Sequence, residues 1–308
     1  MASFLPEGTL LQTDYNRQTL GSEQLLRRAY EEGRILESVA LMCDPAHNVI
    51  VDIPGAEAVI PRTEGALGIA EGVTRDIALL ARVNKPVCFI ITDISRSPEG
   101  RLRYTLSRAA AQKRCSEQYV SRLTAGDVIP ARVTHLENFG AFVDIGCGIP
   151  SLIPIDCISV SRISHPSDRF YNGQYIHAAV KSVEGSMICL THRELLGTWE
   201  QNCARFEVGA TVTGIVRSIE SYGVFIELAP NLAGLAEPHE GLAVGQTVTV
   251  GIKAIKPEKM KLKLVIIDTD HTRRPPKSII YYINKGHITH WRYSPADSTK
   301  LIESTFDR

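Results

Sequence analysis

Two aromatic side chains, Phe139 and Phe142, are the residues whose type and spacing most clearly suggest chemistry. They lie in residues 138–146, which we predict to form a turn followed by a half-buried strand. The strand residues that alternate toward the core are Ala141, Val143 and Ile145. Phe142 then points away from that core, and Gly140 supplies the turn or bulge freedom that brings Phe139 to the same surface. Two neighbouring rings outside a core form a platform on which unpaired bases can stack.

A second pair of rings, Tyr222 and Phe225, has the same spacing. Residues 222–228 (Tyr-Gly-Val-Phe-Ile-Glu-Leu) repeat residues 139–145 (Phe-Gly-Ala-Phe-Val-Asp-Ile), which indicates one supersecondary unit used twice. The alternative for the first pair is packing beneath the long segment 156–173. We favour base stacking for the first pair because other residues already supply its core face, and for the second because its corresponding loop is too short to cover the rings.

Basic residues accompany the second repeat. Lysines alternate with apolar residues near its end, so we expect them to line one side: Lys253, Lys256, Lys259, Lys261 and Lys263. The candidates for RNA contacts among them are Lys253, Lys261 and Lys263. We favour a strip that follows phosphates, although lysines also guard exposed strand edges.

Composition excludes several classes of protein. The 308 residues carry 34 basic and 34 acidic side chains, which argues against gripping a duplex through phosphates alone. The seven scattered cysteines and nine histidines show no metal-ligand spacing, so we expect reduced thiols and no metal site. The N-terminus lacks a signal-peptide pattern, and no apolar run reaches membrane-spanning length. We expect a soluble, cytoplasmic protein with no catalytic constellation, cofactor, small-molecule substrate or membrane partner.

The pattern of apolar residues predicts three mainly-β units. We expect an N-terminal arm and helix (1–32), a first unit (33–110), a helical linker (111–124), a second unit (125–193), a further helical linker (194–205), a third unit (206–268) and a C-terminal segment (269–308). Residues 1–21 are expected to be extended, and a helix begins after Ser22. Each unit shows five strand-like runs, which is typical of a small barrel.

The C-terminal segment has its own pattern. A stiff basic stretch, residues 272–277, precedes two strand-like runs, 279–283 and 287–293, around Asn284-Lys285-Gly286. We predict a hairpin there, followed by a short helix near 297–306. Its aromatic and basic side chains could extend a nucleic-acid surface. We favour a hairpin that buries Ile283 and Trp291 against the third unit.

Several motifs carry a family resemblance. They are Gly126-Asp127-Val128, Phe139-Gly140-Ala141-Phe142-Val143-Asp144, Ser164-His165-Pro166-Ser167, Gly173-Gln174 and Leu190-Thr191. Together they closely resemble the S1 RNA-binding domain family, whose fold is a five-stranded OB-fold barrel. Residues 206–267 resemble a second such domain with a short loop, and 33–108 a degenerate one. The layout resembles the short S1-like ribosomal proteins of Gram-positive bacteria.

The resemblance implies tandem S1 barrels that bind single-stranded RNA in translation. The family's stacking aromatics fall on the two ring pairs, and its fifth-strand basic residue falls on Lys263 but on Cys189 in the second unit. Arg162 and His165 lie in segment 156–173, where the family approaches RNA, and simple solvation of both is equally open. The first unit has His47 and Ile50 at the aromatic positions, so it lacks a stacking pair. The main expectation is a non-enzymatic binder of mRNA at the small ribosomal subunit.

Two alternatives to that function stay open. One is a scaffold that docks on the small ribosomal subunit through residues 1–110 and binds RNA weakly. The other is a targeting subunit of an RNA-processing complex.

Overall fold

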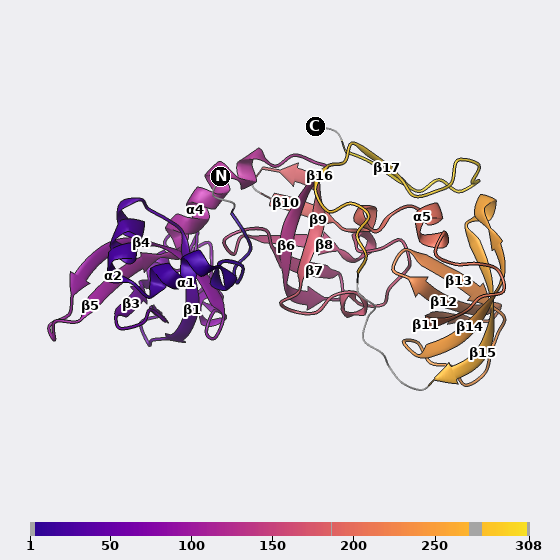
Figure 1. The fold of residues 1–308 in the computed structure, drawn as a ribbon, viewed down its shortest axis with the longest axis horizontal. Coiled ribbons are helices and arrows are strands. Elements are labelled where there is room, and N and C mark those ends of the chain that lie inside the picture. The colour runs from indigo at the N-terminus through magenta and orange to yellow at the C-terminus, as the bar shows by residue number, and fades with distance from the viewer. Residues whose placement is uncertain (1–3, 186, 271–278, 307–308) are drawn as a thin grey trace. The chain divides into compact units, whose positions relative to one another are not determined.

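The computed structural model of the protein describes residues 4–185, 187–270 and 279–306 (Figure 1). The basic stretch 272–277 therefore lies outside the described residues. The chain divides into two compact units, and from here on "unit" refers to these two and "barrel" to the three predicted β units. The first contains Met1–Leu123 and Asp144–Pro150, and the second contains Thr124–Val143 and Ser151–Arg308.

Three rings of strands follow one another along the chain. The first is β1 (Leu36–Cys43), β2 (Val49–Val51), β3 (Glu57–Ile60), β4 (Pro86–Arg96) and β5 (Leu102–Ser107). The second is β6 (Asp127–Glu137), β7 (Gly140–Asp144), β8 (Pro150–Pro154), β9 (Tyr175–Glu184) and β10 (Met187–Thr191). The third is β11 (Thr211–Glu220), β12 (Gly223–Ala229), β13 (Leu232–Ala236), β14 (Thr247–Lys256) and β15 (Lys261–Asp270).

All three rings share one topology. The first and third are closed barrels with strand orders β1-β2-β3-β5-β4 and β11-β12-β13-β15-β14. The second has the order β6-β7-β8-β10-β9, and pairing of β6 with β9 closes it. In each ring the third and fifth strands run parallel. This is the five-stranded OB-fold, so the predicted fold class of three tandem S1-type barrels is confirmed.

Short helices connect and flank the barrels. In the first unit they are η1 (Leu10–Gln12), α1 (Asp14–Leu20), α2 (Glu23–Glu31), η2 (Arg62–Glu64), α3 (Ile77–Leu80), α4 (Arg108–Gln118) and η3 (Val120–Arg122). In the second they are η4 (Ile155–Cys157), η5 (Pro166–Asp168), η6 (Arg193–Leu196), α5 (Trp199–Cys203) and η7 (Pro257–Lys259). The helix predicted after Ser22 is α2, and the Ser22 hydroxyl caps it.

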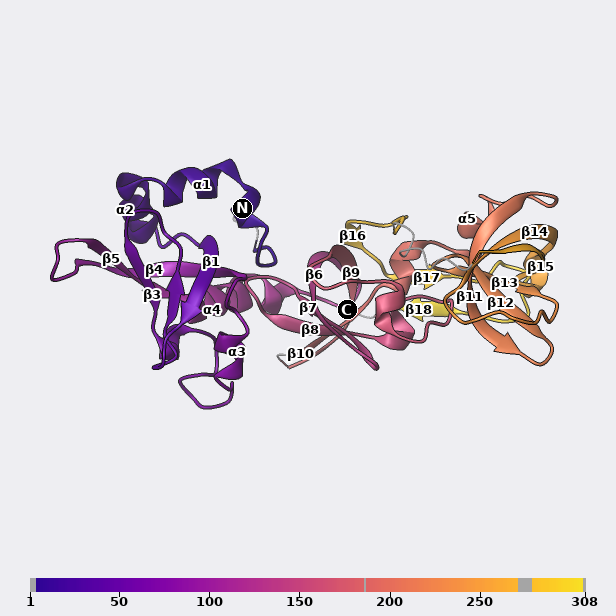
Figure 2. The same cartoon turned by 90° about the horizontal axis from the view of Figure 1, so that it is seen from below.

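The N-terminal segment is folded, so the expectation of an extended arm is wrong for residues 4–21. Helix α1 begins after Thr13, whose hydroxyl accepts a hydrogen bond from the Asn16 N–H at 3.3 Å. The buried Asn16 amide exchanges two hydrogen bonds with the backbone of Glu37 on β1, at 2.7 and 2.9 Å. Helices α1 and α2 lie along one side of the first barrel (Figure 2). These partners are distant in sequence, which is why local composition did not predict them.

A buried ion pair holds the start of the chain. The Glu7 carboxylate accepts hydrogen bonds from Arg108 Nε and Nη2 at 2.6 and 3.0 Å, and both side chains are almost fully buried. The Glu7 N–H donates to Asp144 Oδ2 at 2.7 Å. Burial and the nearby charge of Glu7 raise the pKa of Asp144 to about 7. The arm is thus tied to polar groups inside the first unit.

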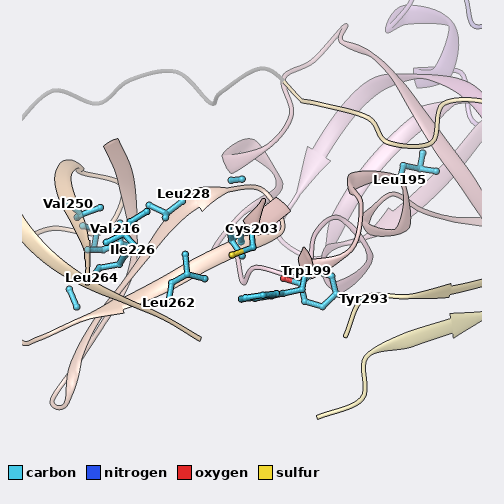
Figure 3. Close-up of a cluster of buried hydrophobic side chains, with 14 of the residues drawn as sticks. Leu195, Trp199, Cys203, Val216, Ile226, Leu228, Val250, Leu262, Leu264 and Tyr293 are labelled. Atoms are coloured by element: carbon cyan, nitrogen blue, oxygen red, sulfur yellow. The ribbon is translucent and has the colours of Figure 1, made fainter. Parts of the chain in front are cut away.

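One apolar cluster joins the third barrel, the connection before it and the C-terminal segment. The third barrel contributes residues such as Val216, Ile226 and Leu264, and the connection between barrels contributes Leu195, Trp199 and Cys203 (Figure 3). The predicted helical linker is present but interrupted, because Gly197 has a φ of 81° between η6 and α5. The C-terminal segment adds Ile288, Trp291, Tyr293 and Phe306 to the same cluster.

The C-terminal segment differs from the predicted hairpin and helix. Residues 279–283 form no strand, and β16 (Gly286–His287) pairs with β6 of the second barrel. Strand β17 (His290–Arg292) pairs with β18 (Glu303–Thr305), which lies where a helix was expected. The physical reason is tertiary pairing: the Ile288 N–H donates to the Gly126 carbonyl, and Trp199 N–H donates to the Tyr293 carbonyl, both at 2.9 Å. Burial of Trp291 was predicted correctly.

His192 joins this segment to the second barrel. Its Nδ1–H donates to the Ile158 carbonyl at 2.9 Å, so the neutral Nε2 accepts from the Tyr281 hydroxyl at 3.1 Å. The imidazole is fully buried. Burial lowers the pKa of His192 from 6.5 to about 4.

The depressed pKa of His192 predicts acid sensitivity. Above pH 6.5 the imidazole is neutral in both states, so the full stability of the second unit is present. As the pH falls toward 4, the unfolded chain takes up a proton that the folded chain resists, so stability decreases by roughly 3 kcal/mol. Urea unfolding near neutral pH and in mild acid measures this loss. His192→Asn, which keeps an N–H for Ile158, should lose less stability on acidification; an equal loss in both proteins would contradict the assignment.

Candidate nucleic-acid interface

The two predicted ring pairs are present and nearly identical. The Phe139 and Phe142 rings meet edge to face, with centroids 5.9 Å apart and planes at 88°. The Tyr222 and Phe225 rings do the same at 6.2 Å and 89°. Phe139 is 56% exposed and Tyr222 is 65% exposed, so neither outer ring is covered by a loop. The alternative that Phe139 packs beneath segment 156–173 is therefore wrong, and the rings are available to a ligand.

The glycine after each outer ring is needed for close packing of two strands. A Cβ at Gly140 would lie 2.5 Å from the Ile153 carbonyl oxygen, and one at Gly223 would lie 2.5 Å from that of Ala236. Gly140 was expected to supply turn or bulge freedom. In the third barrel the register of the β11–β12 pair shifts on β11, between Val216 and Ser218.

Strand register places a lysine on the ring face of the third barrel. Phe225 pairs with Leu235 on β13, and Leu235 pairs with Lys263 on β15. Residues paired across adjacent strands share a face, at about 4.8 Å per strand, so Lys263 lies about 10 Å along the row from Phe225. The exposed Lys263 ammonium can therefore reach the phosphate of a nucleotide that stacks on the ring.

The other two barrels lack this cation. In the second, Leu152 pairs with Cys189, which takes the place of Lys263. In the first, the row runs from Ile50 through Val59 to Thr105 and contains neither a ring nor a positive charge. The three barrels therefore offer different surfaces from one strand arrangement.

Segment 156–173 of the second barrel forms a cleft with the ring face of the third. The cleft has a volume of about 610 Å³. The second barrel contributes Ser161, Arg162, Ile163 and Ser164, and the third contributes Arg217, Ser218, Glu220, Tyr222, Phe225 and Ala233. Three of the predicted residues thus line one cleft: Arg162, Tyr222 and Phe225. The sequence placed Arg162 in the second barrel, but its position beside the rings of the third barrel depends on how the two barrels pack.

A buried charge network holds this cleft together. Glu227 on β12 accepts from Arg169 of the second barrel and, at 2.8 Å, from Nε of Arg217 on β11. Arg217 also pairs with Asp168 at 2.8 Å. Burial lowers the pKa of the Arg169 guanidinium, because its charge is removed from water. The nearby charge of Glu227 opposes this effect and favours the charged form of Arg169. Two arginines and two acids therefore neutralise one another at the barrel junction.

The remaining predicted residues lie outside the cleft. Lys253 is exposed and forms an ion pair with Glu237 at 3.8 Å. Lys261 is exposed and stands directly opposite Lys256, so two like charges face each other and favour an anion between them. His165 has a local structural role, because its Nδ1 accepts from the Ser167 N–H at 3.1 Å and caps η5.

His135 is a residue that the sequence analysis missed. Its ring stacks on Phe142 at 6.5 Å and 26°, and its Nε2 pairs with Glu137 at 2.7 Å. In the third barrel Ser218 is the residue opposite Phe225. Aligning the two repeats places His135 with Ser218 and Glu137 with Glu220, so this signal was available in the sequence.

Three other features of the described residues concern metal ligands, cysteine pairing and membrane-spanning helices. Across residues 4–185, 187–270 and 279–306, no group of three or more His, Cys, Asp or Glu side chains is placed to hold a metal ion. All seven cysteines are free thiols. The helices in these same ranges are too short or too polar for any of them to cross a membrane.

Comparison with known proteins identifies the central barrel. Residues 122–186 match the family model described as S1 RNA binding domain. The chain is similar to the small ribosomal subunit protein bS1 homolog of Bacillus subtilis, 30% identical over 61% of this chain and 53% of that protein. Proteins named small ribosomal subunit protein bS1 match from Rhizobium meliloti (27% identical, 80% of this chain, 45% of theirs) and Staphylococcus haemolyticus (34%, 53% and 46%).

The chain spans about half the length of these curated relatives. The predicted resemblance to S1 domains and to S1-like ribosomal proteins, Gram-positive ones included, is confirmed.

Removing Glu227 tests the charge network. Glu227→Ala leaves Arg169 and Arg217 buried without their shared acid, so we expect the free energy of unfolding of the second unit to fall by about 3–5 kcal/mol. Urea denaturation measures the change. Glu240→Ala removes an exposed acid from the same barrel and should cost little. A loss below about 1 kcal/mol for Glu227→Ala would show that the network does not stabilise the junction.

Proposed function

We propose that this chain binds single-stranded RNA, chiefly mRNA, through its second and third barrels and acts without catalysis in translation at the small ribosomal subunit. The observation that carries the proposal is the ring pair of exposed Tyr222 and half-buried Phe225, with Phe225 in register with Lys263. Rings accept bases of any sequence, and an adjacent cation balances the phosphate. The S1 match and the bS1 relatives support the same proposal.

Local rather than global charge supports recognition of unpaired strands. The chain has no net charge, so phosphate attraction alone would be weak. Positive side chains instead gather near the rings: Arg162 in the cleft, and Lys261 and Lys263 on β15. A duplex hides its base faces, whereas a single strand presents them to both ring pairs. Such a role implies the cytoplasm as its site of action.

Replacing the rings tests RNA binding. Each stacked base contributes about 1–3 kcal/mol, so Tyr222→Ala with Phe225→Ala should weaken binding of unstructured RNA by roughly tenfold to a hundredfold. Fluorescence anisotropy with a labelled oligonucleotide measures the affinity.

The double variant Phe139→Ala with Phe142→Ala should weaken RNA binding less, because the His135 ring already stacks on Phe142 and Cys189 replaces the lysine. Ile50→Ala, at the corresponding position of the first barrel, is the matched control and should change nothing. Unaltered affinity in both double variants would refute the stacking proposal.

A second function, docking of the first barrel on the small ribosomal subunit, is favoured by one observation. Large apolar side chains are exposed around α3 and on β1: Leu41 (49%), Met42 (50%), Val73 (83%), Ile77 (65%) and Leu80 (44%). The row of paired residues that corresponds to the ring-bearing row of the other barrels is also apolar here, from Met42 through Ile50 to Val59. Apolar surface of this kind fits a protein partner better than a polyanion.

Charge placed on this surface tests docking. The double change Val73→Asp with Ile77→Lys in the full chain should abolish co-sedimentation with nuclease-treated ribosomes while leaving RNA affinity unchanged. Both side chains are exposed, so folding should be kept, and circular dichroism checks this. Co-sedimentation equal to that of the unaltered protein would remove the docking role.

A further inference from the structure

We propose that the cleft beside Tyr222 and Phe225 recognises a guanine base through the carboxylate of Glu220. The inference rests on the proposed binding of single-stranded RNA and adds a base preference to that site. Glu220 lines the cleft together with both rings. The cleft volume of about 610 Å³ is enough for a nucleotide.

Strand geometry directs Glu220 toward the ring face. Ser218 pairs with Phe225, and Glu220 pairs with Gly223 in the same hairpin. Because strand side chains alternate, Glu220 and Ser218 project from the same face of β11. A base stacked on Phe225 would therefore have the Glu220 carboxylate at one of its edges.

The two repeats differ at this carboxylate. In the second barrel Glu137 is engaged by His135 at 2.7 Å, and the same histidine stacks on Phe142. In the third barrel a serine replaces that histidine. No hydrogen bond or ion pair from the parts of the chain that the structure describes engages the Glu220 side chain. The replacement of His135 by Ser218 thus leaves Phe225 without a histidine stacked on it and Glu220 without a histidine partner.

An unpaired carboxylate is unfavourable in a site for a polyanion unless it meets N–H donors. Guanine presents two adjacent donors, N1–H and the N2 amine, on its Watson–Crick edge, and they match the two oxygens of a carboxylate. Adenine and cytosine place a ring acceptor beside their amine, and uracil flanks its single N–H with carbonyls. Guanine is therefore the base that the carboxylate accepts best.

Arg162 makes the same cleft compatible with the phosphate. It is exposed, it lines the cleft from the second barrel, and none of the described residues forms a hydrogen bond or ion pair with its guanidinium. A guanidinium offers planar donors that suit phosphate oxygens. The cleft thus offers rings for the base plane, an acid for one base edge and an arginine for the backbone.

Oligonucleotides that differ at one base test the inference. Uridine RNAs of about ten nucleotides, with a single central guanine, inosine or uracil, are titrated into the full-length protein by fluorescence anisotropy. We expect the guanine RNA to bind about tenfold more tightly than the all-uridine RNA, as for a paired base contact. Inosine lacks the N2 amine and should lie between them.

The variant Glu220→Gln presents an N–H where a carboxylate oxygen was, so the guanine-to-uridine affinity ratio should fall to about one. Glu258→Gln removes an exposed acid elsewhere on the third barrel, and the ratio should stay near ten. Equal binding of guanine and uridine RNAs by the unaltered protein, or a preference that survives in Glu220→Gln, would overturn the inference while RNA binding stands. Absence of binding to every RNA would overturn the proposed function itself.

Discussion

The carboxylate of Glu227 is the contact on which the second unit depends. It accepts hydrogen bonds from Arg169 and Arg217, two buried arginines from different barrels, and Asp168 completes the pairing. Charges removed from water are costly unless they are paired, so this network favours the arrangement of the two barrels in which all four side chains meet. That arrangement brings Arg162 to the rings of Tyr222 and Phe225. The cleft is therefore a consequence of electrostatic pairing at a distance from the rings.

The three barrels share one strand order and differ in the side chains of their outer rows. The core faces and strand order are the same, because the alternation of apolar residues determines both. The outer row of the third barrel combines Phe225 with Lys263, the second keeps Phe142 without the lysine, and the first has Ile50 in place of a ring. Function thus varies through outward side chains whose replacement leaves the fold intact.

The C-terminal segment reinforces the second unit by pairing with what is already folded. Strand β16 extends the sheet of the second barrel, while Trp291 and Tyr293 enter the core that contains Trp199. The Tyr293 hydroxyl donates to the backbone of Asn231 in the third barrel, and the buried Asn231 amide accepts from the Val160 N–H at 2.9 Å. These contacts join barrel, linker and C-terminal segment into one folded unit.

The sequence by itself determined the barrels, the ring pairs and the presence of Cys189 where the third barrel has Lys263. Period-two alternation and a repeated motif are local signals, so they can be read without the structure. It also contained the exchange of His135 for Ser218, which becomes informative only beside the observed stacking on Phe142. Only the tertiary structure decided that α1 forms through Asn16 and Glu37, that residues 303–305 form a strand, and that Arg162 faces Tyr222. Each of these depends on residues that are not neighbours in the chain, brought together by hydrogen bonding of buried backbone groups, by strand pairing or by the packing of two barrels.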